Sequence, residues 1–171
     1  PTINHHWGTG AVFYLAHKAF GFIGLTLLNV LVHLGIFFLL VNIGLKRSPI
    51  WVFFPVLVVF VPLLTGRAQL RPETFSYFFV LFYLFLVFEK RMEGKWQWLW
   101  MAALFIAQAI WSNLHIYAML GPFIMFLYGV QKLLDREDWT CYIPFIISVA
   151  GLFLNANGIK GGLERFRIRN D

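Results

Sequence analysis

Two arginines flank a short polar segment that has the chemistry of an anion-binding site. Arg67 and Arg71 are separated by three residues, and Pro72 and Glu73 follow Arg71 directly. Because proline is favoured in the first turn of a helix, we expect a helix to begin here with its positive N-terminal end beside both guanidinium groups. That arrangement suits a phosphate or a diphosphate. Two alternatives stay open: the arginines anchor lipid headgroups, or Arg71 pairs with Glu73.

A second polar cluster follows an apolar run, at Trp111-Ser112-Asn113-Leu114-His115. Amide and imidazole groups near a membrane are usually buried in protein or in a wet cavity. A histidine there could hydrogen-bond a sugar hydroxyl or a phosphate, or shuttle a proton. We therefore interpret Asn113 and His115 as candidates for positioning a substrate, and Trp111 as a side chain of the membrane interface. The alternative is that the cluster only caps the turn between two helices.

Two shorter clusters lie near the ends of the chain. His5 and His6 precede Trp7, and another polar segment begins at Asn155. Adjacent residues in an extended chain point to opposite sides, so the two histidines do not form a ready pair of metal ligands. Zinc would need further ligands. We predict no metal site and no cofactor, and leave a requirement for a divalent metal open.

A polar stripe interrupts the longest apolar run. Thr26, Asn29 and His33 follow a spacing of three and then four, which places them on one face of a helix. We expect this face to look into a helix bundle and to form hydrogen bonds between helices, rather than to contact a substrate. The sequence has no glycine-rich phosphate loop or nucleophile elbow, and no pair of neighbouring carboxylates near these clusters, so residues that could act as a general base are scarce.

The composition indicates what surrounds these clusters. The 171 residues are 60% hydrophobic and 19% aromatic, and only 13% are charged. Soluble domains carry roughly 25% charged residues, and a soluble globule of this size could not bury so many apolar side chains. The net charge of +6 does not indicate nucleic acid, because the basic residues lie between apolar runs and not along one face. The composition therefore predicts an integral membrane protein.

Six apolar runs are candidates for membrane helices, which need about 20 residues each. They cover residues 21–45, 49–65, 72–88, 96–112, 116–134 and 139–155. Pro55 and Pro62 predict kinks in the second. We expect an all-α fold, a polytopic transmembrane helical bundle with about six membrane helices plus one interfacial helix. Residues 1–20 would end an outer loop with that interfacial helix, residues 21–155 would form the bundle, and residues 156–171 an outer loop or the next segment.

Charge in the loops predicts the orientation. If all six runs cross, seven basic residues fall in loops on one side: Lys46, Arg47, Lys90, Arg91, Lys95, Lys132 and Arg136. The internal loops of the other side hold only Arg67 and Arg71. By the positive-inside tendency that side is cytoplasmic, although a basic C-terminal tail on the other side weakens the bias. All four polar clusters then share the outer face. The chain starts at Pro1 without a signal peptide, so we expect it to be an internal segment of a longer protein.

Four short motifs occur in order along the chain. They are Asn4-His5-His6-Trp7, Arg71-Pro72-Glu73-Thr74-Phe75-Ser76, Trp111-Ser112-Asn113-Leu114-His115 and Asn155-Ala156-Asn157-Gly158. In these motifs the chain resembles bacterial membrane glycosyltransferases of the GT-C fold, a group that includes the dolichyl-phosphate-mannose-type mannosyltransferases. The similar pattern in that group reads Asn-His-Glu-Trp, Arg-Pro-Gln/Glu-x-Phe-Ser, Trp-x-Asn-Leu-His-Gly and Asn-Pro-x-Gly. This chain departs from it at His6, Ile116 and Ala156.

The resemblance implies transfer of a sugar from a polyprenyl-phosphate carrier to a glycan, lipid or protein acceptor. It implies a multi-pass protein of the bacterial inner membrane, with the motif loops on the periplasmic side and a catalytic aspartate encoded before Pro1. Arg71, helped by Arg67, would bind the donor phosphate. Substrate would be positioned by His5, His6, Trp7, Glu73, Asn113, His115 and Asn155. A lipid-carrier flippase or transporter and a structural membrane subunit are the alternatives.

Overall fold

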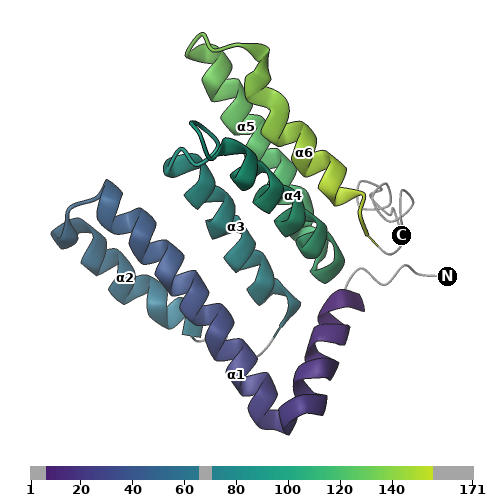
Figure 1. Ribbon diagram of the computed structural model, residues 1–171. Helices are drawn as coiled ribbons and strands as arrows, with labels where there is room; N and C mark the ends of the chain where they lie inside the picture. Colours follow the sequence, from purple (N-terminus) through teal and green to yellow (C-terminus); the bar gives the residue numbers. More distant parts are fainter. Residues whose placement is uncertain (1–6, 66–70, 156–171) are drawn as a thin grey trace, which may run out of the picture.

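The computed structural model describes residues 7–65 and 71–155, without the side chains of residues 63–65, and this part of the chain is all-α (Figure 1). The elements are α1 (Trp7–Arg47), α2 (Ile50–Thr65), α3 (Pro72–Phe88), α4 (Gln97–Leu114), η1 (Ile116–Met119), α5 (Leu120–Leu134), η2 (Trp139–Tyr142) and α6 (Ile143–Leu152). The all-α prediction is confirmed. His5, His6, Arg67 and the predicted outer segment at 156–171 lie outside the described residues.

A sharp bend divides α1 at the predicted end of the interfacial helix. Phe20 has φ −139° and ψ 16°, and Gly21 has φ +60°, a left-handed conformation that favours glycine. The two arms of the bend approach closely, because a Cβ on Gly24 would lie 2.2 Å from the carbonyl oxygen of Ala16. The two arms are close together at the bend and form a sharp V, as Figure 1 shows.

The helix α2 lies against the outside of α1. It runs as one helix with Pro55 and Pro62 inside it, and the kinks expected at these prolines stay a prediction. Its buried apolar side chain is Phe53, whose ring fills the space beside Gly44: a Cβ on Gly44 would lie 2.1 Å from a ring carbon. Most other apolar side chains of α2 are exposed. In Figure 1, α2 lies at the edge of the bundle, beyond α1.

The core lies between α3, α4, α5 and α6, with α1 packed against α3. Aromatic rings fill its centre. Trp111 is completely buried, stacks on Phe79 with ring centroids 5.3 Å apart, and meets Tyr83 edge to face at 5.7 Å. Our prediction that Trp111 lies at the membrane interface is therefore wrong. The reason is that Trp111 lies on the face of α4 that packs against Phe79 and Tyr83 of α3.

Two segments are long and apolar enough to cross a membrane: Trp7–Arg47, and Ile116–Leu134, which consists of η1 and α5. The apolar helices Ile50–Pro62, Pro72–Phe88 and Trp139–Leu152 are shorter. Each of the six runs that we expected to be helical contains a helix of the structure. Six membrane crossings stay a prediction.

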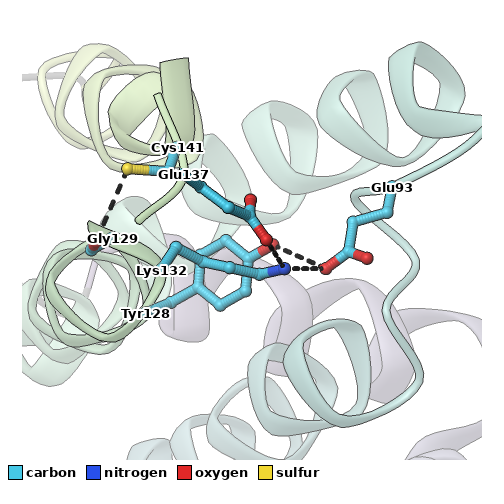
Figure 2. A network of polar contacts seen from close by, with 6 residues as sticks. All are labelled: Glu93, Tyr128, Gly129, Lys132, Glu137 and Cys141. Atoms are coloured by element: carbon cyan, nitrogen blue, oxygen red, sulfur yellow. Dashed lines mark hydrogen bonds and ion pairs between the residues drawn. The ribbon is translucent and has the colours of Figure 1, made fainter. Parts of the chain in front are cut away.

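Ion pairs tie together the connections at one end of the bundle. Lys46, at the end of α1, pairs with Glu89, which follows α3. Lys132 of α5 lies between two carboxylates, 2.6 Å from Glu93 and 2.7 Å from Glu137. Figure 2 shows Lys132 reaching between the α3–α4 and α5–α6 connections. The loops that we predicted to be cytoplasmic therefore meet at one end.

Two further contacts strengthen this network. The Tyr128 hydroxyl donates a hydrogen bond to Oε1 of Glu93 at 3.2 Å, and the Cys141 thiol contacts the carbonyl oxygen of Gly129 at 3.5 Å. Gly129 leaves room for the ring of Tyr142, because a Cβ there would lie 2.8 Å from that ring. The η2 segment, which leads into α6, is thus held directly against α5 (Figure 2).

The network predicts a pH-dependent stability. Partial burial of Glu93 acts to raise its pKa, but the contacts with Lys132 and Tyr128 outweigh that effect and hold the pKa below its usual value. A carboxyl with a depressed pKa stabilises the fold above its unfolded pKa, and this contribution is lost as the pH falls through the folded pKa. We expect Glu93→Gln to cost at most about 1 kcal/mol at neutral pH, and to cost progressively less below about pH 4.

Thermal unfolding in detergent from neutral to acidic pH measures this difference. Asp135→Asn, which alters an exposed carboxyl at the same end, is the control. A Glu93→Gln penalty that stays constant as the pH falls would contradict the role that we give to the ion pair.

The orientation can be tested with two exposed positions at opposite ends. In a Cys141→Ser background, Lys95→Cys marks the charged end and Leu154→Cys marks the end where α6 stops. We expect an impermeant maleimide added to intact cells to label position 154 and to reach position 95 only after permeabilisation. Labelling of both positions from one side would refute the predicted topology.

Candidate functional site

The C-terminal end of α4 carries a hydrogen-bonded group of buried side chains. The Trp111 indole donates to the Ser76 hydroxyl oxygen at 3.0 Å, and that oxygen lies 2.9 Å from Nδ1 of His115. His115 has extended backbone angles, with φ −152° and ψ 149°, so the chain turns here from α4 into η1. Ser76 belongs to the first turns of α3. This group therefore joins the start of α3 to the end of α4.

The N-terminal end of α1 packs against the same C-terminal end of α4. The Thr9 hydroxyl donates to the carbonyl oxygen of Leu114 at 2.7 Å, across 105 positions of sequence. Gly8 lies directly against the backbone of Asn113, since a Cβ at residue 8 would be 2.4 Å from its carbonyl oxygen. Trp7 begins the helix and remains exposed. The two residues that follow the first motif, Gly8 and Thr9, thus pack against the third motif.

The end of α6 is tied to α4 by an amide. Nδ2 of Asn113 donates to the carbonyl oxygens of Ala109, at 2.7 Å, and Leu154, at 2.8 Å. Asn155 donates from Nδ2 to the carbonyl oxygen of Leu152 at 3.1 Å and so caps the end of α6. These contacts give both asparagines a structural task.

The second and third motifs therefore meet at one end of α4, and residues next to the described parts of the first and fourth motifs pack against the same end. That all four motifs share the outer face of a membrane stays a prediction. The individual roles differ from those expected. His115 is only 3% exposed, and its Nδ1 is engaged by Ser76, so it lies behind the surface. The capping alternative fits the observed contacts of Asn113 and His115, whereas Arg71 and Glu73 line an open space.

That space is a cavity of about 600 Å³ between α1, α2, α3 and η1. One part of its lining is polar and another is apolar. The polar residues are His33, Arg71, Glu73, Thr74, Tyr77 and Tyr117, and the apolar residues are Ile36, Leu40, Phe60, Val80 and Leu81. An elongated molecule with a polar head and an apolar tail matches this division.

Arg71 lies at the exact start of α3. Pro72 occupies the first turn, as predicted, and the amide of Thr74 donates to the Arg71 carbonyl oxygen at 3.1 Å. The guanidinium and the positive end of the helix are therefore close to each other. Among the described residues, no ion pair joins Arg71 to Glu73, and Oε2 of Glu73 is buried without a hydrogen-bond partner. The alternative in which these two side chains neutralise each other is not observed.

The polar stripe of α1 behaves differently from our prediction. Thr26 is exposed, and its hydroxyl donates to the carbonyl oxygen of Phe22 at 3.1 Å. His33 donates from Nδ1 to the carbonyl oxygen of Asn29 at 2.9 Å. For Thr26 and His33 the expected bonds between helices are replaced by bonds to the preceding turn of the same helix. His33 instead lines the cavity.

Two tyrosines of the cavity were missed in the sequence. Tyr77 and Tyr117 are both exposed enough to meet a ligand. The ring of Tyr117 lies edge-on to His115, with centroids 4.5 Å apart and planes at 88°. The buried His115 therefore supports a residue of the cavity wall. Nothing in the local sequence distinguishes these tyrosines from the other aromatic residues around them.

A buried glutamine was also missed. Gln108 is fully buried in α4, donates from Nε2 to the carbonyl oxygen of Ala118 at 2.8 Å, and accepts a hydrogen bond from the Tyr83 hydroxyl. Gly121 makes room for it, since a Cβ there would lie 2.2 Å from Oε1 of Gln108. The sequence did carry a signal for it, because a lone glutamine inside an apolar run must find a hydrogen-bond partner in the interior.

The described residues contain no group of three or more His, Cys, Asp or Glu side chains that could hold a metal ion. Comparison with protein-family models, with curated proteins and with solved structures gives no match. Any functional conclusion therefore depends on the cavity and on the short motifs.

The Ser76 hydrogen bonds predict a specific loss of stability. Ser76→Ala removes the partner of the Trp111 indole and of Nδ1 of His115, both in the interior. Leaving buried polar groups unsatisfied costs about 1–3 kcal/mol. We expect a correspondingly lower midpoint in thermal unfolding, whereas the control Thr26→Ala, at an exposed hydroxyl, should change it little. Equal midpoints for Ser76→Ala and the parent would contradict the proposed junction.

Proposed function

We propose that this chain belongs to a multi-pass membrane glycosyltransferase that transfers a sugar from a lipid-phosphate carrier to an acceptor on the outer side of the membrane. The observation that carries the proposal is the cavity beside α3, which combines Arg71 at a helix N-terminus with an apolar wall. The motif resemblance points to the same chemistry.

The polar part of the cavity suits a phosphate. Arg71 can present two parallel N–H donors to phosphate oxygens, and the N-terminal end of α3 adds a favourable field. Tyr77 and Tyr117 add hydroxyl groups beside it. A leaving phosphate gains negative charge as the bond to the sugar breaks, so fixed positive charge at this point would favour the transition state.

The apolar part suits the carrier's hydrocarbon chain. Leu81 is ten residues beyond Arg71 in sequence, which corresponds to about 15 Å along a helix. Leu40 and Phe60 contribute to the apolar wall from α1 and α2. A prenyl chain that starts at the phosphate could therefore follow α3 toward the centre of the bilayer.

In the reaction that we propose, an acceptor hydroxyl attacks the anomeric carbon of the sugar. The bond from that carbon to the phosphate oxygen breaks, and the lipid phosphate leaves with the electron pair. The acceptor proton passes to a general base, which by the resemblance is an aspartate encoded before Pro1. Among the described residues, the task left to this chain is to hold and orient the donor.

We also propose six crossings, with the charged end of Figure 2 in the cytoplasm. Among the shorter helices, α2 and α3 have 16 and 17 residues, or about 25 Å at 1.5 Å per residue. The segment of η2 and α6 is shorter, with 4 and 10 residues, or about 20 Å. Both lengths are less than the hydrocarbon thickness of about 30 Å. Local thinning or flanking interfacial residues can make up such a difference.

A lipid-carrier flippase using the same arginine is the second candidate. Transporters place substrate sites near the midplane, often at broken helices related by internal repeats. Here the polar lining of the cavity lies at the start of α3, and the second and third motifs meet at the same end of the bundle. These observations favour an enzyme.

Donor binding should be most sensitive to Arg71. In the intact protein, Arg71→Ala should lose a charge-assisted contact worth about 1.5–3 kcal/mol, or roughly ten- to a hundredfold in affinity. Arg71→Lys should recover only part of this, because lysine offers a point charge without the bidentate geometry. Binding of a prenyl-phosphate sugar in detergent measures the effect, with Lys95→Ala at the opposite end as the control. If Arg71→Ala binds like the parent at equal thermal stability, the phosphate site is wrong.

A further inference from the structure

Glu73 is an unexpected residue to find in a cavity for an anion. Its side chain lines the same cavity as Arg71, and within the described part of the chain Oε2 is buried and has no hydrogen-bond partner. A carboxylate at this position repels a bare phosphate. A buried acceptor without a donor also destabilises the protein that carries it. A ligand that brings a donor to Glu73 satisfies the buried acceptor and offsets the repulsion.

His33 adds a second acceptor to the same cavity. A carbonyl oxygen can only accept, so the 2.9 Å contact with Asn29 requires the proton of His33 to be on Nδ1. In the neutral imidazole, Nε2 is then an acceptor. The cavity therefore combines one strong donor group, Arg71, with two acceptor groups, Glu73 and His33. A ligand that matches both kinds of group carries an anion and several O–H or N–H donors.

We propose that Glu73 is a specificity-determining residue that accepts hydrogen bonds from the group esterified to the phosphate. The cavity would thus distinguish a lipid phosphate that carries a hydroxylated or amino-substituted sugar from the bare lipid phosphate. The proposal rests on the proposed function, since it assigns the phosphate to Arg71. It adds a physical reason why the loaded carrier binds in preference to the spent one: the spent carrier leaves Glu73 without a donor and beside a phosphate of higher charge.

The test measures binding of three probes to the full chain in detergent: a short prenyl phosphate, its hexosyl ester and its aminohexosyl ester. We expect the parent to bind at least one of the esters more tightly than the bare phosphate. Glu73→Ala should weaken that ester about tenfold, the effect of one lost hydrogen bond to a charged group. The same substitution should leave the bare phosphate unchanged or bound more tightly, because a repulsive charge is removed.

Glu73→Gln separates the two kinds of donor. The amide keeps one acceptor oxygen but has no charge. It should therefore restore much of the binding of a hydroxyl-bearing ester and little of the binding of an ammonium-bearing one. Without a ligand, Glu73→Gln should unfold at an equal or higher temperature than the parent, because the parent's Oε2 is buried without a hydrogen-bond partner. A folded Glu73 variant is thereby available for the binding measurement.

The outcomes distinguish this inference from the function on which it rests. Arg71→Ala should weaken all three probes, and Asp138→Asn, an exposed carboxyl at the opposite end, should weaken none. If Arg71→Ala acts as expected but Glu73→Ala changes all probes equally or not at all, the role of Glu73 is overturned and the phosphate site stands. A parent protein that binds the bare phosphate as tightly as both esters also overturns it. If Arg71→Ala has no effect on any probe, the proposed function itself fails.

Discussion

The rest of the structure depends on one requirement, that the polar groups of α4 find partners away from water. Gln108, Trp111 and His115 are almost completely buried, and each carries hydrogen-bonding groups that are costly to leave unsatisfied. Their partners come from other elements: Ala118 from η1 for Gln108, and Ser76 from α3 for Trp111 and His115. Once these bonds form, the relative positions of α3, α4 and η1 are fixed. The cavity beside α3 inherits its shape from that arrangement.

At this end of the molecule, an inner layer of residues holds the helices together and an outer layer lines the cavity. The inner layer consists of Ser76, Trp111 and His115, which hold the helices together. The outer layer consists of cavity residues, of which Tyr117 rests edge-on against the His115 ring. This division explains why a motif can contain a buried histidine without that histidine touching a substrate. The first turns of α3 serve both layers, because Ser76 faces the interior while Glu73 lines the cavity.

Much of the helical architecture was predictable, because long apolar runs bounded by Pro, Gly and charged residues leave few alternatives in a membrane-like sequence. The break at Gly21 and the start of α3 at Pro72 could be predicted from these bounding residues. The meeting of the second and third motifs followed from helix alternation. Side-chain environment was harder to predict: Trp111 is buried although tryptophan suits an interface, since it lies on the face of α4 that packs against α3. The contribution of His33 to the cavity depends on how α1 lies against α3, which no local pattern encodes.

The contact between Gly44 and Phe53 fixes one part of α2 against α1. Phe53 is the point at which α2 is fixed to α1, and Phe60, seven residues further on, forms part of the cavity wall. The distance between them along the helix is about 10 Å, so a tilt of about 10° around Phe53 displaces Phe60 by about 2 Å. Such a displacement is comparable with half the width of a hydrocarbon chain. The packing of Phe53 on Gly44 therefore bears on the width of the cavity at Phe60, and a side chain at residue 44 would change that width from a distance.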